Sequence, residues 1–191
     1  MTQQIQLQIV DDKVKVITPY NADFVQKCRN LRGTFKNGAW WFDDSIIDYV
    51  REAMIQFYGT TGETSYETCS LLISDYTQYG QRTPCILFGR TIAKAFGRDS
   101  GARLGEDIVL LEGEVRSGGS VKNWETCISD ATFLINNFPI PSLELPEVKA
   151  AIEEGWCEVK PNKKKRPAAE IEAEITELEK RIESLNAELL S

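Results

Sequence analysis

Histidine is absent from this 191-residue sequence, and its absence removes several kinds of chemistry at once. Without it there is no Ser–His–Asp or Cys–His nucleophile, no His-ligated zinc and no histidine general base. The five cysteines are odd in number and show no CxxC spacing, so they are expected to be reduced, mostly buried thiols. No carboxylate pair has a placed partner either. The sequence therefore predicts no catalytic residue, no metal and no cofactor, and it favours a binding protein over an enzyme.

Long apolar runs are also missing. No run approaches the roughly 18–20 residues that are needed to span a bilayer. The opening segment, MTQQIQLQIVDDK, has neither the basic stretch nor the apolar centre of a secretory signal. We therefore expect a cytoplasmic protein with no membrane partner.

Basic residues are fewer than acidic ones, and they are unevenly spread. The chain has 22 Lys and Arg against 29 Asp and Glu, a net charge of −7. Residues 1–60 carry seven of each sign, whereas residues 61–146 carry seven basic and eleven acidic residues. Such a charge repels phosphate unless it is segregated, so the overall acidity favours a protein partner. Any contact with nucleic acid is expected first in the less acidic residues 1–60.

Residues 1–60 carry signals for a small module of strands and helices. Residues 5–9 alternate apolar and polar side chains, which predicts a strand, and Val14–Ile17 is the expected return strand. Asn21 is a candidate helix N-cap. Asn37-Gly38 predicts a tight hairpin, and Gly59 is placed to end a second helix. The expected order is ββαββα.

The rest of the chain predicts three further segments. Residues 61–140 indicate a small antiparallel β domain, in which residues 86–96 alternate as one strand, with a helix over 91–96 as the alternative. Residues 141–167 contain prolines, a short helix and a basic spacer, and are expected to be a linker. Residues 168–191 show a heptad pattern. The predicted fold class is therefore α+β: the ββαββα module, the antiparallel β domain and a C-terminal coiled-coil helix.

The heptad positions predict self-association. Apolar residues recur at spacings of four and three, and isoleucine at a with leucine at d favours a parallel dimer. These positions are Ile171, Ile175, Leu178, Ile182, Leu185 and Leu189. A homodimer through this helix is the preferred interpretation, and packing on its own protein or docking on another protein are the alternatives.

The candidate binding residues of the first module surround a tryptophan pair. In a hairpin at Asn37-Gly38, Trp40 shares one face with the neighbouring phenylalanines and Trp41 points to the other face. Trp41 is then either an exposed stacking platform or a residue buried against the second domain. Phosphate contacts could come from Lys27, Arg32 and Lys36, whose alternative role is a solvated basic face.

A second set of candidates lies beside two glycine-containing turns, at residues 97–101 and 117–120. Loops of this kind often carry function in small domains. The cations in or beside them are Arg98, Arg103, Arg116 and Lys122. We expect these residues to bind a partner protein or nucleic acid.

The first third of the chain resembles the HARP domain of annealing helicases and its relatives in mobile-element proteins. The resemblance is carried by Pro19-Tyr20-Asn21 before a helix, by Phe24 and Leu31, and by Trp40-x-Phe42 after a short hairpin. It implies a role in handling fork-like or single-stranded DNA. Trp41 departs from the pattern, and a helicase motor is lacking, so ATP-driven remodelling is not implied.

The second domain is similar to proteins from phages and plasmids. The similarity is carried by the segments GRDSGARLG, at residues 97–105, and SGGSVKNW, at residues 117–124. Small acidic proteins of that origin include inhibitors of host defence, such as anti-CRISPR proteins. The resemblance thus implies a non-enzymatic inhibitor that engages a protein subunit of a nucleic-acid-processing complex. The alternative is an accessory protein that binds DNA or RNA directly through the HARP-like sheet.

Overall fold

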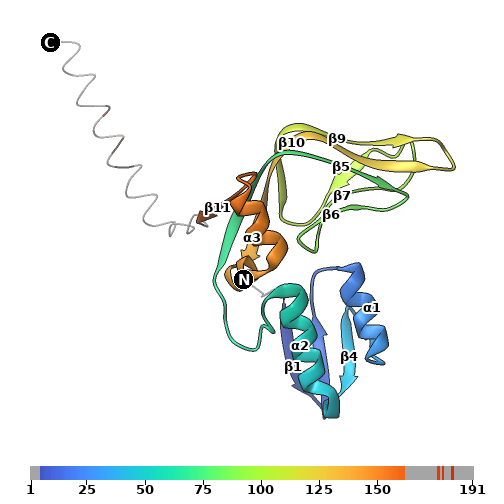
Figure 1. The fold of residues 1–191 in the computed structure, drawn as a ribbon, viewed down its shortest axis with the longest axis vertical. Helices are drawn as coiled ribbons and strands as arrows, with labels where there is room; N and C mark the ends of the chain where they lie inside the picture. The colour runs from blue at the N-terminus through green and yellow to red at the C-terminus, as the bar shows by residue number, and fades with distance from the viewer. Residues whose placement is uncertain (1–4, 162–175, 177, 179–181, 183–191) are drawn as a thin grey trace.

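A computed structural model describes residues 5–161 and residues 176, 178 and 182, and it folds residues 5–161 into two units (Figure 1). The first unit contains four strands and two helices. Its elements are β1 (Gln6–Val10), β2 (Lys13–Ile17), α1 (Ala22–Asn30), β3 (Thr34–Lys36), β4 (Ala39–Asp43), the short 3-10 turn η1 (Asp44–Ile46) and α2 (Ile47–Tyr58). The strands form one antiparallel sheet in the order β1–β2–β4–β3.

Local chemistry accounts for the ends of these elements. The side chain of Asn21 accepts hydrogen bonds from the backbone N–H groups of Asp23 and Phe24, at 2.9 and 3.0 Å, which confirms the predicted N-cap. Asn37 and Gly38 have φ angles of 53° and 75°, as the predicted hairpin requires. Gly59 caps α2 in the left-handed conformation.

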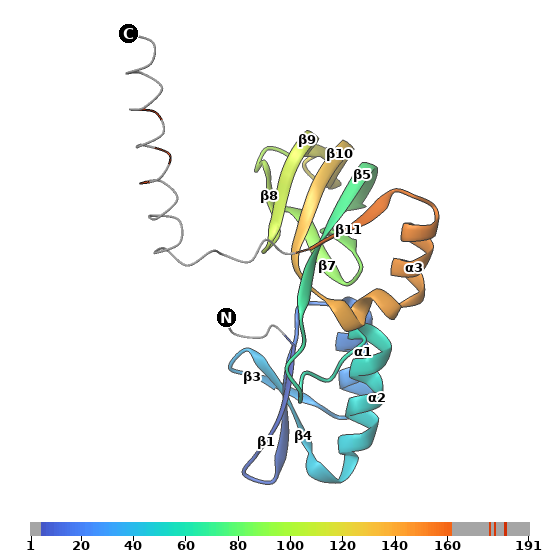
Figure 2. The ribbon, with the colours of Figure 1, turned by 90° about the vertical axis from the view of Figure 1, so that its left-hand side faces the viewer.

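Both helices of the first unit cover the same face of the sheet (Figure 2). Phe24 on α1 and Met54 on α2 belong to one buried cluster with Val16, Trp40 and Phe42 from the strands. The opposite face of this sheet has no helix of the unit over it. We call it the open face.

The second unit is built from two sheets. Its elements are β5 (Thr68–Gln81), β6 (Cys85–Leu87), β7 (Arg90–Ala95), β8 (Ala102–Leu104), β9 (Ile108–Gly119), β10 (Trp124–Pro139), η2 (Ile140–Glu144), α3 (Pro146–Glu153) and β11 (Cys157–Pro161). One sheet has the order β11–β5–β10–β9 and the other β6–β7–β8. Ile73, Ile92 and Phe133 share one core, so the two sheets pack on each other.

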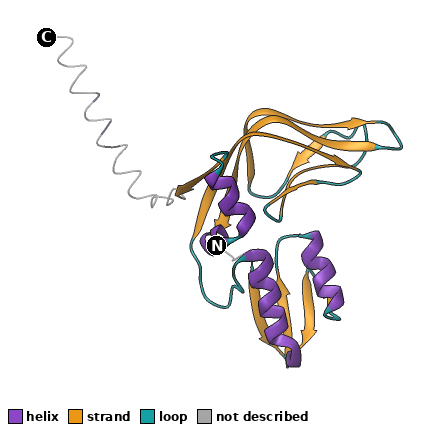
Figure 3. Cartoon of the chain, in the orientation of Figure 1, coloured by secondary structure: helices purple, strands orange, loops and turns teal. Residues whose placement is uncertain are grey.

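The predicted α+β class is wrong, because strands dominate the described residues (Figure 3). Strands hold 48% of these residues and helices 25%, so the described chain is mostly β. The excess comes from β5, β9 and β10, which are 14, 12 and 16 residues long. Each continues through a residue with positive φ that is typical of a turn: Asp75, Gly113 and Asp130.

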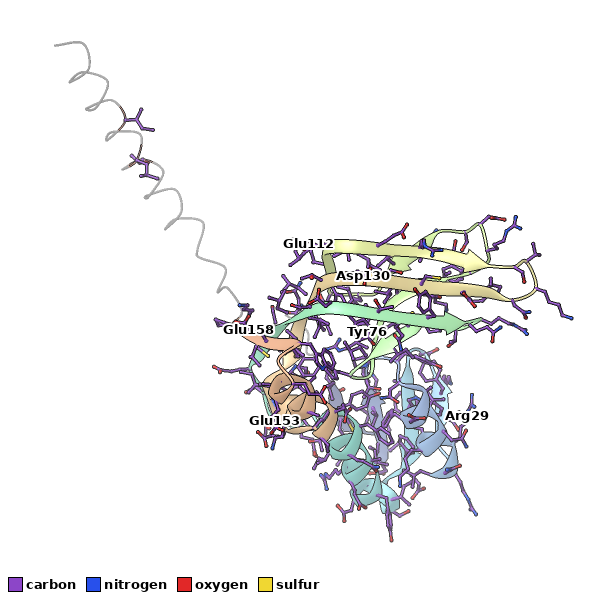
Figure 4. The ribbon with its side chains drawn as sticks, turned by 45° about the horizontal axis from the view of Figure 1, so that its top comes forward. Arg29, Tyr76, Glu112, Asp130, Glu153 and Glu158 are labelled. Atoms are coloured by element: carbon purple, nitrogen blue, oxygen red, sulfur yellow. The ribbon has the colours of Figure 1, made fainter. Side chains whose placement is uncertain are left out.

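These three residues form a line of bulges across neighbouring strands. Ala131 pairs with Tyr76, and a Cβ on Gly113 would lie 2.4 Å from the carbonyl oxygen of Asp130. Figure 4 labels Tyr76, Glu112 and Asp130, which lie on adjacent strands at this level. Bulges of this kind strengthen the local twist of a strand and bend it.

Two further expectations differ from the structure. Residues 86–96 form β6 and β7 rather than one strand, because Phe88 and Gly89, with φ angles of 49° and 69°, make a turn between them. Residues 141–161 are not a linker: Val148 and Cys157 belong to the core of the second unit, and β11 pairs with β5.

The predicted coiled coil falls mostly on residues that lie outside the described ones. Ile171, Ile175, Leu185 and Leu189 lie outside, whereas Leu178 and Ile182 are helical and exposed. The described fold thus contains no coiled-coil interface, and the homodimer stays a prediction. None of the described helices combines the length and the apolar character that crossing a bilayer would demand.

The two units meet at the end of α2. The hydroxyl of Ser142 donates a hydrogen bond to the backbone carbonyl oxygen of Tyr58. The hydroxyl of Tyr58 in turn donates to the carbonyl oxygen of Pro19 at 2.8 Å. A Cβ on Gly59 would lie 2.7 Å from the carbonyl oxygen of Pro141. Buried Arg90 donates to the carbonyl oxygen of Asn137 at 3.3 Å beside this joint.

Replacing Gly59 with alanine should lower the stability of the protein by more than the positive φ angle of Gly59 alone explains. Gly101 has nearly the same φ (67° against 68°), but no atom lies within 4 Å of its Cβ position. We expect Gly101→Ala to cost about 1–2 kcal/mol through the left-handed backbone. Gly59→Ala should cost about 1–3 kcal/mol more through the clash with Pro141 and Ser142. Urea unfolding measures the loss of stability in both variants. Equal losses would show that Pro141 and Ser142 can move away from the new methyl group without cost.

Candidate nucleic-acid interface

Trp41 lies on the open face of the first sheet. Antiparallel partners share a face, and Trp41 pairs with Lys15 on β2 and with Thr34 on β3. The ammonium of Lys15 lies 5.7 Å from the centre of the Trp41 ring, within the range of a cation–π contact. The indole N–H donates to the carbonyl oxygen of Lys36 at 3.2 Å, which fixes the orientation of the ring.

The neighbouring tryptophan points the other way, as predicted. Trp40 is buried at 8% exposure, with its ring centre 5.3 Å from that of Phe35 and 6.5 Å from that of Phe42. Trp41 is only partly buried. The contacts described for Trp41, with Lys15 and Lys36, both come from the first unit.

Cations from the two strands that flank β4 accompany Trp41. Lys36 pairs with Ala39, two residues before Trp41 on β4, so Lys36 shares the open face. Lys13 pairs with Asp43 on the same face. Hydrogen bonds from Ser45 are the main cause of the lowered pKa of Asp43, and the charge of Lys13 adds to it. The open face thus presents an aromatic ring among Lys13, Lys15 and Lys36.

Sequence reasoning missed Lys13 and Lys15 and misplaced two other cations. Lys27 lies on α1, a helix of the covered face, and Arg32 lies in the turn after it, with a φ of 59°. The structure therefore does not bring Lys27 and Arg32 together with Trp41. The missed signal is the alternation of Lys13 and Lys15 with buried Val14 and Val16.

The cations of the second unit divide into paired and unpaired ones. Arg98 forms an ion pair with Asp99 at 2.8 Å, and Arg116 forms one with Glu114 at 3.1 Å. Arg103 on β8 instead lies beside the ring of Phe96, and Lys122 is exposed in the turn between β9 and β10.

Ser117 joins the loop that follows β7 to β9. Its hydroxyl donates to the carbonyl oxygen of Arg98 at 2.7 Å and accepts from the N–H of Gly101 at 3.0 Å. The predicted loop residues therefore share one end of the second unit.

The described residues offer little for catalysis. All five cysteines are free and buried, and burial raises the pKa of Cys28 to about 12 and that of Cys85 and Cys157 to about 11. Within the described part of the chain, no cluster of three or more His, Cys, Asp or Glu could hold a metal ion. The small cavity beside the joint, lined by Tyr58, Arg90 and Ser142 among others, has a volume of about 10 Å³, far below the roughly 300–1,000 Å³ of most ligand sites. That the protein is not an enzyme stays a prediction.

Comparison with protein-family models, with curated proteins and with solved structures finds no match for this chain. The resemblance to HARP domains and to phage and plasmid inhibitors thus stays a prediction.

The two tryptophans should differ in their effect on stability. Trp40→Ala removes a buried ring and should lower the free energy of unfolding by about 3–5 kcal/mol. Trp41→Ala removes a partly exposed ring and should cost about 1 kcal/mol or less. Chemical denaturation of both variants tests this, and equal losses would contradict the assignment of the two faces.

Buried thiols should make the fold sensitive to alkali. The folded pKa of Cys28 is raised above the unfolded value of 9.0, so its contribution to stability is complete below that value and is lost as the pH rises above it. We expect the free energy of unfolding to fall from about pH 8 to about pH 10. Cys28→Ala should show a shallower fall in urea unfolding. An identical pH dependence in both proteins would exclude this role of Cys28.

Proposed function

We propose that this protein is a non-enzymatic binding protein whose open face binds single-stranded nucleic acid. The observation that carries the proposal is the cation–π contact of Lys15 with Trp41, on a sheet face that the helices of the unit leave uncovered. An aromatic ring beside cations combines the two contacts that single strands use, base stacking and phosphate pairing.

A single strand fits this face better than a duplex. Bases can stack on a protein side chain only where they are unstacked from each other, as in single strands, loops and ends. The open face is a sheet surface with an indole held by a hydrogen bond, and it presents no helix of the unit that could enter a groove.

The charge distribution supports the same surface. Residues 1–60 are neutral overall in a chain of net charge −7, and Lys15 and Lys36 form no ion pair with a described carboxylate. Cations that are free of carboxylates can release the counterions of the phosphates that they contact. The expectation of a protein partner within a defence complex stays a prediction beside this proposal.

The open face should make binding depend on salt. We expect the affinity for a labelled oligothymidylate, measured by fluorescence anisotropy, to fall with increasing NaCl. Lys15→Ala combined with Lys36→Ala should make the log–log slope shallower by about 1.4, at about 0.7 for each contact. Trp41→Ala should weaken binding about tenfold with the slope unchanged.

The control is Lys27→Ala combined with Arg32→Ala, which removes the same charge from the helical side. This variant should keep the slope of the original protein. If it loses as much slope as the variant of Lys15 and Lys36, or if the original protein does not bind the oligonucleotide, the proposal is wrong.

A further inference from the structure

A second group of cations surrounds an exposed ring in the other unit. Lys94 on β7 pairs directly with Arg103 on β8, and Phe96 directly follows β7. The ammonium of Lys94 lies 5.0 Å from the centre of the Phe96 ring, and the guanidinium carbon of Arg103 lies 6.0 Å from it. We call these three residues the Phe96 cluster.

The two cations of the Phe96 cluster lie opposite each other, and their repulsion destabilises the sheet. Residues directly opposite in an antiparallel pair have Cβ atoms about 4.5–5.5 Å apart, and like charges at such positions destabilise the sheet. Among the described residues neither Lys94 nor Arg103 forms an ion pair with a carboxylate. Arg98 and Arg116, in the same loop region, are both paired. An anion between Lys94 and Arg103 would offset their repulsion.

The ring of Phe96 is too exposed to be explained by the core. It is 61% exposed, whereas Ala93 and Ala95 on the same strand are fully buried. Contacts with the two cations hold the ring in place but leave most of its surface in solvent. A ligand that fits this cluster therefore carries a negative charge next to a flat ring, as a nucleotide does.

We propose that the Phe96 cluster is a second nucleotide-binding site on the same protein. It takes one nucleotide of a single strand, with the phosphate between Lys94 and Arg103 and the base stacked on Phe96. The inference rests on the proposed function for the class of ligand, but it uses none of the residues of the open face.

Charge-matched double variants test the site. Lys94→Ala combined with Arg103→Ala should make the salt slope for the labelled oligothymidylate shallower by about 1.4. Arg98→Ala combined with Arg116→Ala removes the same charge from the same end of the second unit and should leave the slope unchanged, because these arginines are already paired. Thermal melting checks that both variants are folded.

The ring is tested without any change of charge. Phe96→Leu keeps an apolar side chain but removes the stacking surface, and it should weaken binding about tenfold. Phe96→Trp should bind at least as tightly as the original protein. Thymidine monophosphate should compete less strongly than the oligonucleotide, because one nucleotide cannot occupy the open face and the Phe96 cluster at the same time.

The outcomes separate this inference from the proposed function. Loss of slope in the open-face variant alone would overturn the second site and leave the proposed function standing. Loss of slope in the Phe96-cluster variant alone would overturn binding by the open face and leave the second site standing. The second site would also be overturned if the variant of Lys94 and Arg103 kept the same slope as the variant of Arg98 and Arg116. Equal affinity of Phe96→Leu and Phe96→Trp would overturn it as well.

Discussion

The alternation of side chains along an extended strand is the constraint on which both proposed surfaces depend. On β4, burial of Trp40 and Phe42 in the core forces Trp41 to the opposite face. On β7, burial of Ala93 and Ala95 does the same for Lys94. The exposed residues are therefore positioned by the core, and a rigid core keeps the rings and the cations in one place. No separate scaffold is needed to orient them.

Local signals predicted the first unit in much of its detail. Asn21 and Asn37-Gly38 act through their own backbone chemistry, so their roles could be recognised without knowledge of the fold. The opposite orientation of Trp40 and Trp41 follows from the same local rule. The partners of Trp41 could not be found in this way. Lys15 lies 26 positions away in the sequence and reaches the ring only because β2 pairs with β4.

The second unit was harder to predict because residues typical of turns lie inside its strands. Asp75 and Asp130 have the positive φ of a turn, but both are bulges within longer strands. Phe88-Gly89 turns the chain without the usual asparagine or aspartate, so the break between β6 and β7 had no clear signal. The prolines of residues 139–146 suggested a linker, yet the chain after them returns to the sheet as β11.

The line of bulges also determines how the long strands can be aligned. A slip of one residue between two strands would move every side chain to the wrong face, and long strands offer many such slips. The bulges of the three strands lie side by side in only one alignment. In that alignment the neighbours are Asp75, Gly113 and Asp130, which all have a left-handed backbone. Any shifted pairing would set a bulge against regular strand. The bulges therefore act as a register lock, which selects one alignment of β5, β9 and β10 among many with similar hydrogen bonding.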